Sequence, residues 1–359
     1  MSDSLQRLYV NVGFETIFTT YIEQNFNSPL EEKFMFRFLP TLLKFMMAIA
    51  VLSFSLSASA AECPRGTLDK QFCDRDGNLT ADLPTDPSKW VDPDSLIFAY
   101  TPVEDPAVYK SVWAGFIDHM SSVTGKKVIF FSVQSNAAQL EAMRSGRLHV
   151  AGFNTGSNPI AVSCAGFVPF AMMASSDGSF GYEMEIIVPV DSPIMTPADI
   201  KGRTLTFTSP TSNSGNKAPS ALLKSEFGLI KDVDFKTNFS GKHDNSVLGI
   251  ANNDYEVAPI ANSVMRRMVD RKVVDPSKIR TIYKSQTFPT TGFGHAHNLD
   301  PTLSAKIRQA FFTFEWEGSA LKAEFEKSGE GKFISIAHKF DWDVIRKIDS
   351  ANGIKYTCK

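Results

Sequence analysis

Short apolar runs alternate with amphipathic segments along most of this chain, and that alternation restricts its fold more than any other feature. Leu96–Tyr100 fits a strand that is buried on both faces. Pro106–Thr124 then places apolar residues at helical spacing and ends before Gly125, a residue suited to a left-handed helix stop. Strand and helix patterns follow each other again at residues 128–131, 137–145 and 148–153. This order predicts parallel strands with crossover helices, and hence a layered α/β domain.

A second α/β unit begins with the strand expected over residues 183–190. Further helices and strands are expected up to the strand at 279–283, and two last helices, at 301–314 and 341–351, are placed to complete the first unit. Two lobes joined by crossing strands form a cleft, and open α/β sheets bind ligands beyond the carboxyl ends of their strands. The predicted divisions are an N-terminal extension (61–95), the first part of lobe 1 (96–180), lobe 2 (181–287) and the C-terminal part of lobe 1 (288–359).

The charges of the chain are balanced, with 37 Lys and Arg against 39 Asp and Glu. No overall field therefore recruits nucleic acid or an anionic membrane, and any charge selectivity must be local. No apolar run reaches the about 18 residues that predict a membrane-spanning helix, so no stable membrane insertion is expected. No Cys or His pair has the spacing of metal ligands, so we expect neither a metal nor a cofactor. The balanced charge therefore favours a small molecule as partner, and we expect the protein to be a monomer.

The segment before residue 61 has the order of a secretory signal. Arg37 and Lys44 precede the apolar run Phe45–Leu56, and the small residues Ser57–Ala61 follow it. We expect cleavage after residue 60 or 61 and a periplasmic mature protein; the alternative is a buried helix over the apolar run. Because residues 1–34 carry several carboxylates, translation is expected to begin at Met35 or at residue 46.

Export to an oxidising compartment allows the four cysteines to form disulfides. Cys63 and Cys73 bracket a polar stretch that could not otherwise hold itself against the core, and closing so short a loop should stabilise the protein by roughly 3 kcal/mol. Cys164 and Cys358 are left for each other. A lipid anchor on Cys63 is the alternative, although Glu62 is charged where a lipidation signal has a small residue.

Thr208–Pro219 joins a buried strand to a helix and is crowded with hydroxyl groups. Ser212, Asn213 and Ser214 stand where the helix exposes unpaired N–H groups and about half a positive charge. Gly215 allows the backbone to approach a ligand closely. The segment therefore predicts a cradle of neutral donors for a tetrahedral oxyanion, and the alternative is a helix cap in a polar loop.

Leu205–Pro210 followed by Ser212–Gly215 resembles the signature of the periplasmic substrate-binding proteins of phosphonate, phosphite and phosphate ABC transporters. Thr101–Pro106, Gly181–Glu183 and Gly241–Ser246 agree with it, and the similarity spans roughly residues 96–351. The resemblance implies a type II periplasmic binding protein, in which each lobe has a mixed, mainly parallel sheet flanked by helices and the ligand lies between the lobes. It also implies capture without catalysis, hinge segments near Gly181 and Gln286, and an ABC transporter permease as partner.

The same resemblance assigns roles to individual residues. It implies that Ser212, Asn213 and Ser214 contact phosphoryl oxygens and that His243 closes on the same group from a neighbouring helix start. It also implies a facing half-site after the strand that ends at residue 153, formed by Thr155, Gly156 and Ser157.

The chain departs from the family pattern where phosphonate binders commonly place tyrosines that hydrogen-bond the ligand. It has Asn136 and Phe153 there, so Tyr100 or Tyr182 is expected to supply the missing hydroxyl groups. The departure leaves the choice among phosphorus oxyanions open.

Glu256 and Asn262 align with the region in which the family's carboxylates meet a ligand amine or a protonated oxygen, and Glu256 is the candidate we retain. Lys217 is predicted to be a solvated helix residue that does not contact the ligand.

A periplasmic hydrolase is one alternative function, with Ser214 as nucleophile and His243 as base. The sequence has no Gly-x-Ser-x-Gly elbow, no metal-ligand cluster and no Gly-x-x-x-x-Gly-Lys-Ser loop, and many hydroxyls suit binding better than one activated serine. A ligand-sensing module that reports to a receptor is the other alternative, and it would share the same fold.

Overall fold

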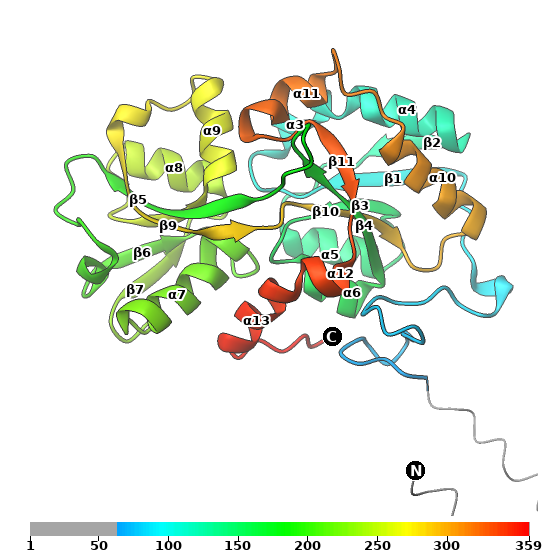
Figure 1. Ribbon diagram of the computed structural model, residues 1–359, viewed down its shortest axis with the longest axis horizontal. Coiled ribbons are helices and arrows are strands. Elements are labelled where there is room, and N and C mark those ends of the chain that lie inside the picture. The colour runs from blue at the N-terminus through cyan, green and yellow to red at the C-terminus, as the bar shows by residue number, and fades with distance from the viewer. Residues whose placement is uncertain (1–62, 359) are drawn as a thin grey trace, which may run out of the picture. The chain divides into compact units, whose positions relative to one another are not determined.

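The computed structural model describes residues 63–358, so the predicted signal and the residues upstream of it lie outside the described residues. The described chain forms two lobes that are joined by long crossing strands (Figure 1). None of the helices within this range has the length and apolarity needed to cross a membrane. No cluster of three or more His, Cys, Asp or Glu residues in the same range is arranged to hold a metal ion.

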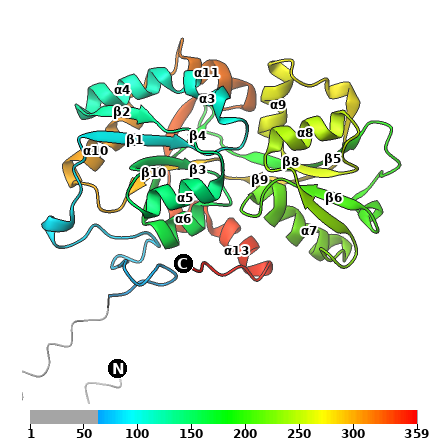
Figure 2. The same cartoon turned by 180° about the vertical axis from the view of Figure 1, so that it is seen from behind.

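Lobe 1 is built on a six-stranded mixed sheet in the order β11-β4-β10-β3-β1-β2. Strand β1 pairs in parallel with β2 and β3, whereas β10 runs antiparallel to β3 and β4, and β11 runs antiparallel to β4. The strands are β1 (Ser95–Tyr100), β2 (Lys127–Phe130), β3 (Val150–Phe153), β4 (Phe167–Ala174), β10 (Gly292–Ala296) and β11 (Lys332–Ser335). The helices around this sheet are α3 (Pro106–Val112), α4 (Ala114–Thr124), α5 (Asn136–Arg144), α6 (Asn158–Ala165), α10 (Pro301–Phe312) and α11 (Ala320–Phe325) (Figures 1 and 2).

Lobe 2 contains a three-stranded sheet in the order β8-β5-β9 and a parallel pair, β6-β7. A bridge between Leu205 and Val257 joins the two into one surface. The strands are β5 (Tyr182–Pro189), β6 (Thr204–Phe207), β7 (Lys236–Phe239), β8 (Ala258–Ala261) and β9 (Ile279–Phe288). The helical segments are η2 (Pro197–Ile200), the π-helical turn η3 (Asn213–Lys217), α7 (Ala218–Phe227), α8 (His243–Ala251) and α9 (Asn262–Asp270).

The two-lobed α/β fold confirms the predicted fold class, but the expectation of mainly parallel sheets is wrong: three of the described strand pairs are parallel and five are antiparallel. The reason is the crossing: β9 pairs antiparallel with β5, and β10, which follows β9 back into lobe 1, enters between β3 and β4 against their direction. Gly181 lies directly before the start of β5 and beside the end of β9, and it has φ +121°. A Cβ at this position would clash with the Thr287 side chain of β9, so glycine is required there.

Each lobe has its own hydrophobic core, and the larger one fills lobe 1. Phe153 belongs to that core and packs edge-on against Phe167, with ring centroids 4.8 Å apart. Phe153 is therefore a core residue, and it does not line the cavity between the lobes.

The C-terminal helices, α12 (His338–Asp341) and α13 (Asp343–Ala351), differ from the expectation that residues 288–359 complete lobe 1. Trp342 and Ile345 are fully buried in a core cluster of lobe 2, because the apolar face of α13 packs against α7 and η3. The last described residue, Cys358, is bonded back to Cys164 of α6 in lobe 1. The C-terminal segment thus touches both lobes.

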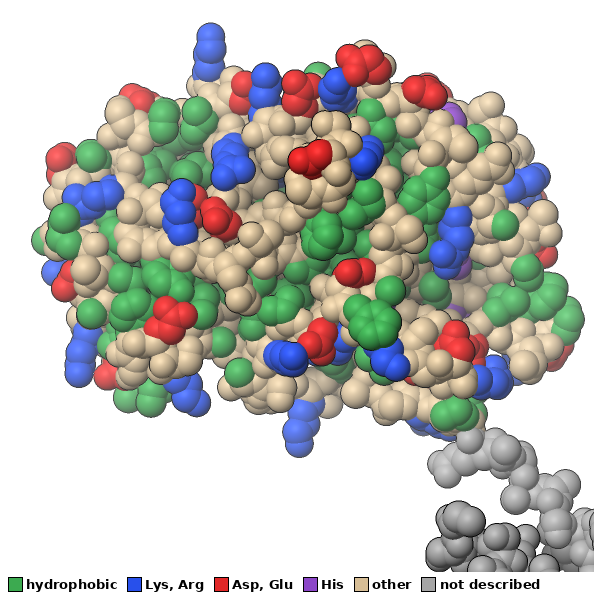
Figure 3. Space-filling view, viewed as in Figure 1, with side chains coloured by type: hydrophobic (Ala, Val, Ile, Leu, Met, Phe, Trp, Pro, Cys, Tyr) green, Lys and Arg blue, Asp and Glu red, His purple; other side chains and the backbone are tan. Residues whose placement is uncertain are grey.

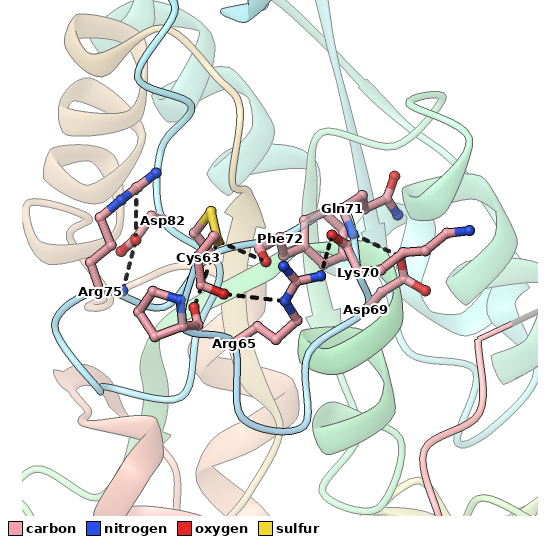
Figure 4. Close-up of a disulfide and its surroundings, with 10 residues drawn as sticks. Cys63, Arg65, Asp69, Lys70, Gln71, Phe72, Arg75 and Asp82 are labelled. Atoms are coloured by element: carbon pink, nitrogen blue, oxygen red, sulfur yellow. Dashed lines mark hydrogen bonds and ion pairs between the residues drawn. A yellow bond between two sulfur atoms is a disulfide. The ribbon is translucent and has the colours of Figure 1, made fainter. Parts of the chain in front are cut away.

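The N-terminal extension is fastened to lobe 1 as the cysteine spacing predicts. Cys63 is bonded to Cys73, and Arg65 donates to the carbonyl of Lys70 at 2.8 Å inside the loop (Figure 4). The backbone N–H of Asp69 then donates to a carbonyl of α6. Both predicted disulfides are present, and Cys63 lacks the free thiol that a lipid anchor requires.

Candidate functional site

A cavity of about 60 Å³ lies between the lobes, where β1, β3 and β6 end. Its walls combine hydroxyl, amide and aromatic groups from both lobes with a few charged groups. The polar lining residues are Tyr100, Asn136, Asn154, Thr155, Tyr182, Thr208, Ser209, Ser212, Asn213, Ser214, Lys242, His243, Ser263, Arg267, Thr290, Thr291 and Glu330. Most of the residues predicted from the sequence are therefore brought together here.

The lobe 2 wall is the predicted serine-rich segment, now seen as η3 at the end of β6. The Ser212 hydroxyl caps this turn by accepting from the Gly215 backbone N–H at 3.0 Å. A Cβ on Gly215 would overlap the Thr208 side chain, so the glycine is needed for packing against the strand end and not for approach to a ligand. The segment is thus a helix cap and a cavity wall at once.

Two buried polar atoms of this wall have no hydrogen-bond partner among the described residues: Thr208 Oγ1 and Asn213 Oδ1. The amide nitrogen of Asn213 is occupied, since it donates to the Tyr182 hydroxyl at 3.2 Å. Buried polar atoms are almost always bonded to protein or to water, and both residues line the cavity. The unpaired atoms therefore suit a polar ligand that can both donate and accept.

His243 begins α8 and presents one ring nitrogen to the cavity. Its Nδ1 accepts from the backbone N–H of Ala261 at 3.1 Å, which leaves the ring hydrogen on Nε2. Nε2 lies 3.3 Å from the Ser212 hydroxyl oxygen. Burial lowers the pKa of His243 to about 4, so the ring is a neutral donor at neutral pH. Because the Ser212 oxygen then accepts two hydrogen bonds, its own hydrogen remains for a ligand.

The lobe 1 wall differs from the expected half-site. Asn154 Oδ1 accepts from the backbone N–H groups of Gly156 (3.1 Å) and Ser157 (2.9 Å), so the donors predicted at this helix start are already used. Gly156 and Ser157 lie behind the wall, and only Thr155 and Asn154 line the cavity. The Thr155 hydroxyl donates to the carbonyl of Pro289 at 2.7 Å.

Asn136, Tyr100 and Tyr182 all reach the cavity, as the departure from the family pattern requires. The Asn136 amide donates across the cleft to the Thr211 hydroxyl at 3.0 Å. Burial raises the pKa of both tyrosines, so their hydroxyl groups stay protonated. The sequence signal for these residues was the resemblance to the family: Tyr100 ends β1, Tyr182 begins β5 and Asn136 begins α5.

A buried ion-pair cluster at the edge of the cavity was missed. Arg267 of α9 donates to Glu104 of lobe 1 at 3.0 Å and to the Ser328 hydroxyl at 3.0 Å. Glu330 accepts from the same hydroxyl, and burial raises its pKa. The wall is therefore not made of neutral donors alone. Arg267 stands three residues after the buried Val264, a helical spacing that could have indicated an inward position.

Glu256, which the sequence suggested as a ligand-binding residue, does not line the cavity. One carboxylate oxygen accepts from the Thr204 backbone N–H at 2.9 Å, and the other lies 3.4 Å from Arg203. The side chain thus covers the edge of β6 and is partly exposed. Asn262 bonds the backbone and side chain of Glu183 and does not line the cavity either.

The expectation that Lys217 is solvated is wrong. Its side chain is only 4% exposed and pairs with Asp349 of α13, whose side chain is 1% exposed. The reason is the C-terminal helix, which covers η3 and which the sequence placed on the other lobe.

The comparisons with known proteins agree with the two-lobed fold and identify the family. The family described as ABC transporter, phosphonate, periplasmic substrate-binding protein matches residues 98–338. The phosphate-import protein PhnD of Mycolicibacterium smegmatis is 26% identical over 280 residues, which cover 74% of this chain and 85% of that protein. The phosphonates-binding periplasmic protein of Escherichia coli is 28% identical over 224 residues, which cover 61% of this chain and 66% of that protein.

Two solved structures share the fold. A binding protein component of an ABC phosphonate transporter from Pseudomonas aeruginosa has a TM-score of 0.65 at 24% identity, covering 72% of this chain and 86% of that chain. PhnD1 from Prochlorococcus marinus, in complex with methylphosphonate, has a TM-score of 0.64 at 16% identity, covering 73% of this chain and 99% of that chain.

Proposed function

Because the chain belongs to the family of periplasmic substrate-binding proteins of phosphonate ABC transporters, we propose that it captures a small phosphorus oxyanion between its lobes. The observation that carries the proposal is the buried cavity in which hydroxyl, amide and imidazole donors converge while Thr208 Oγ1 and Asn213 Oδ1 stay unpaired. A phosphorus oxyanion has several acceptor oxygens, and a protonated one also has a donor for Asn213 Oδ1.

Capture follows from closure of the lobes. A ligand favours the closed form only through contacts that both lobes make, and here Ser212 and His243 face Asn136 and Thr155 across the cavity. A handful of charge-assisted hydrogen bonds in a dry site can supply the about −8.2 kcal/mol of a micromolar affinity. The closed protein, acting as a monomer in the periplasm, would then deliver its ligand to a membrane permease.

The geometry disfavours the hydrolase alternative. A general base for Ser214 would need a free ring nitrogen, but His243 Nδ1 accepts the Ala261 N–H, and Nε2 carries the ring hydrogen and faces Ser212. No carboxylate orients the ring, because its other nitrogen bonds a backbone N–H. Stoichiometric binding without turnover is therefore the expected behaviour.

Isothermal titration calorimetry with phosphate, phosphite, methylphosphonate and 2-aminoethylphosphonate tests this function, with sulfate as the control anion. We expect one site per chain, with micromolar or tighter affinity for at least one phosphorus compound. Absence of binding across the panel would refute the proposal. Hydrolysis of p-nitrophenyl phosphate that is lost in Ser214→Ala would establish the enzyme instead. Unchanged uptake in a deletion strain would favour the sensor.

A further inference from the structure

The C-terminal strap, which we define as residues 338–358, connects the two lobes a third time. Its helix α13 packs against η3 and α7 of lobe 2, and Ile345 is buried in a core cluster of that lobe. Its end is bonded covalently to lobe 1 through Cys164–Cys358, and Trp342 Nε1 donates to the Thr155 carbonyl of lobe 1 at 3.0 Å. In Figure 1 the strap, coloured red, lies below the two crossing strands.

The strap also supplies one half of a buried ion pair. Lys217 Nζ lies 2.8 Å from Asp349 Oδ1, and the Tyr356 hydroxyl donates to the other carboxylate oxygen at 2.8 Å. Asn352 of the strap donates to the Lys217 carbonyl at 2.8 Å. A buried pair is weak evidence for stability, because desolvation offsets most of the attraction. Its position therefore matters more than its strength.

The position of Lys217 is at the junction of the two cavity walls. It is the last residue of η3, whose Asn213 and Ser214 line the lobe 2 wall. Its ammonium group also donates to the Gly156 carbonyl of lobe 1 at 2.7 Å. Gly156 directly follows Thr155 of the opposite wall, and a Cβ there would clash with backbone atoms of Thr211 and Asn213. One lysine thus joins both walls, and the strap holds that lysine.

We propose that the strap sets the register of the two walls, with Lys217 as a positioning residue, so that anion affinity depends on the Cys164–Cys358 disulfide. The strap would keep α13, Asp349 and Lys217 in place against α6 while the opposite edge of the cleft opens. This inference rests on the proposed function and adds the element that couples the two walls.

Three double variants test the strap. C164A/C358A frees its end, and K217M/D349L removes both charges so that neither is left buried alone. C63A/C73A is the matched control, because it removes a disulfide that closes only a local loop of the N-terminal extension. Calorimetry and stopped-flow dissociation use whichever of inorganic phosphate and methylphosphonate binds more tightly to the wild type.

We expect Kd to rise at least threefold in C164A/C358A and at least tenfold in K217M/D349L, mainly through faster dissociation, and to stay within twofold in C63A/C73A. A strap with a merely structural role would lower the melting temperature while Kd at 25 °C changed less than threefold in both strap variants. That result, or an equal loss in the control, overturns the inference.

Hydrogen exchange of the unliganded protein separates this inference from the proposed function. If the wild type binds no phosphorus compound of the calorimetry panel, the proposed function fails, but the strap can still be tested. We expect faster exchange of the Lys217 N–H, which donates within η3, and of the Ala161 N–H in α6 when Cys164–Cys358 is removed. Unchanged exchange at both positions in C164A/C358A contradicts the coupling.

Discussion

The two walls of the cavity begin from similar sequences and end with different chemistry. Each has small polar residues between a strand and a helix start, at 154–157 in lobe 1 and at 212–215 in lobe 2. In lobe 1 the Asn154 side chain takes the first N–H groups of its own helix. In lobe 2 Ser212 takes one N–H group, and unpaired atoms remain at Thr208 and Asn213. In the proposed function, the lobe 2 wall would therefore hold the ligand and the lobe 1 wall would close over it.

Asn213→Asp should show the largest effect, because it adds a negative charge to the ligand-holding wall. Two like charges about 4 Å apart repel by roughly 4 kcal/mol at an effective dielectric constant near 20. We expect anion affinity measured by calorimetry to fall at least 100-fold. Asn216→Asp is the control: it lies on the same turn, its amide donates to the Pro210 carbonyl, and it does not line the cavity. Equal losses in the two variants would contradict the assignment of the ligand to Asn213.

Gly156→Ala tests closure by lobe 1. The added methyl group would meet the backbone of Thr211 and Asn213 in the opposite wall, so the lobes could not shut fully. We expect an affinity loss of about 30-fold together with a lower melting temperature of the unliganded protein, because the clash is already present in the structure without ligand. Gly115→Ala is the matched control, because it lies in α4 with no atom within 4 Å of the new Cβ. An unaffected Gly156→Ala variant would mean that binding does not require this contact.

Ser212→Ala and His243→Ala should each weaken anion binding at least tenfold, since the first removes the hydroxyl that remains for the ligand and the second removes the ring that orients this hydroxyl. Stability should also fall by about 1 kcal/mol in both, because Ser212 caps η3 and His243 accepts the Ala261 N–H. Calorimetry and urea unfolding separate the two effects. Retained affinity in both variants would remove these residues from the site.

Asn154→Ala should show a smaller loss, about threefold, because its side chain orders the lobe 1 helix start more than it serves the ligand. A loss as large as that of Asn213→Asp would erase the difference between the walls.

Two buried histidines, His243 and His295, should make the free energy of unfolding depend on pH, and substitution of His295 should have the smallest effect on binding. Burial lowers the pKa of His243 in lobe 2 and of His295 in lobe 1 to about 4, whereas an unfolded histidine titrates near 6.5. The unfolded chain therefore binds more protons between these values, so the free energy of unfolding falls as pH drops from about 6.5 toward 4, by up to roughly 1.4 kcal/mol per pH unit for each histidine. In His295→Gln we expect urea unfolding to show a shallower pH dependence, with anion affinity within twofold of wild type. An unchanged slope would mean that His295 titrates normally.

The sequence predicted the lobe 2 wall well because its donors are adjacent in the chain and flanked by a clear strand and helix. It could not show that Asn154 would consume the lobe 1 donors, since that depends on the direction of one side chain. Arg267 and Glu330 reach the cavity from distant segments. Strand β10 was missed because Gly292–Ala296 is rich in glycine and lacks β-branched residues, and only its place between two strands makes it β-structure.

The balanced charge of the sequence is also seen on the face of the molecule in Figure 3, where Lys and Arg side chains are interspersed with Asp and Glu side chains. What composition could not show is the local exception inside the cleft, where Arg267 and Arg271 of one lobe meet Glu104 of the other.

The interlobe ion pairs of Glu104 also affect the unliganded protein. Although burial raises the pKa of Glu104, the two arginines and the Tyr109 hydroxyl lower it overall, so this carboxylate is ionised and depends on lobe 2 for its cationic partners. When the lobes separate, the carboxylate of Glu104 and the guanidinium groups of Arg267 and Arg271 must be rehydrated together. These ion pairs therefore hold the lobes of the unliganded protein together. We expect added salt to weaken these interlobe ion pairs and to speed the exchange of bound ligand.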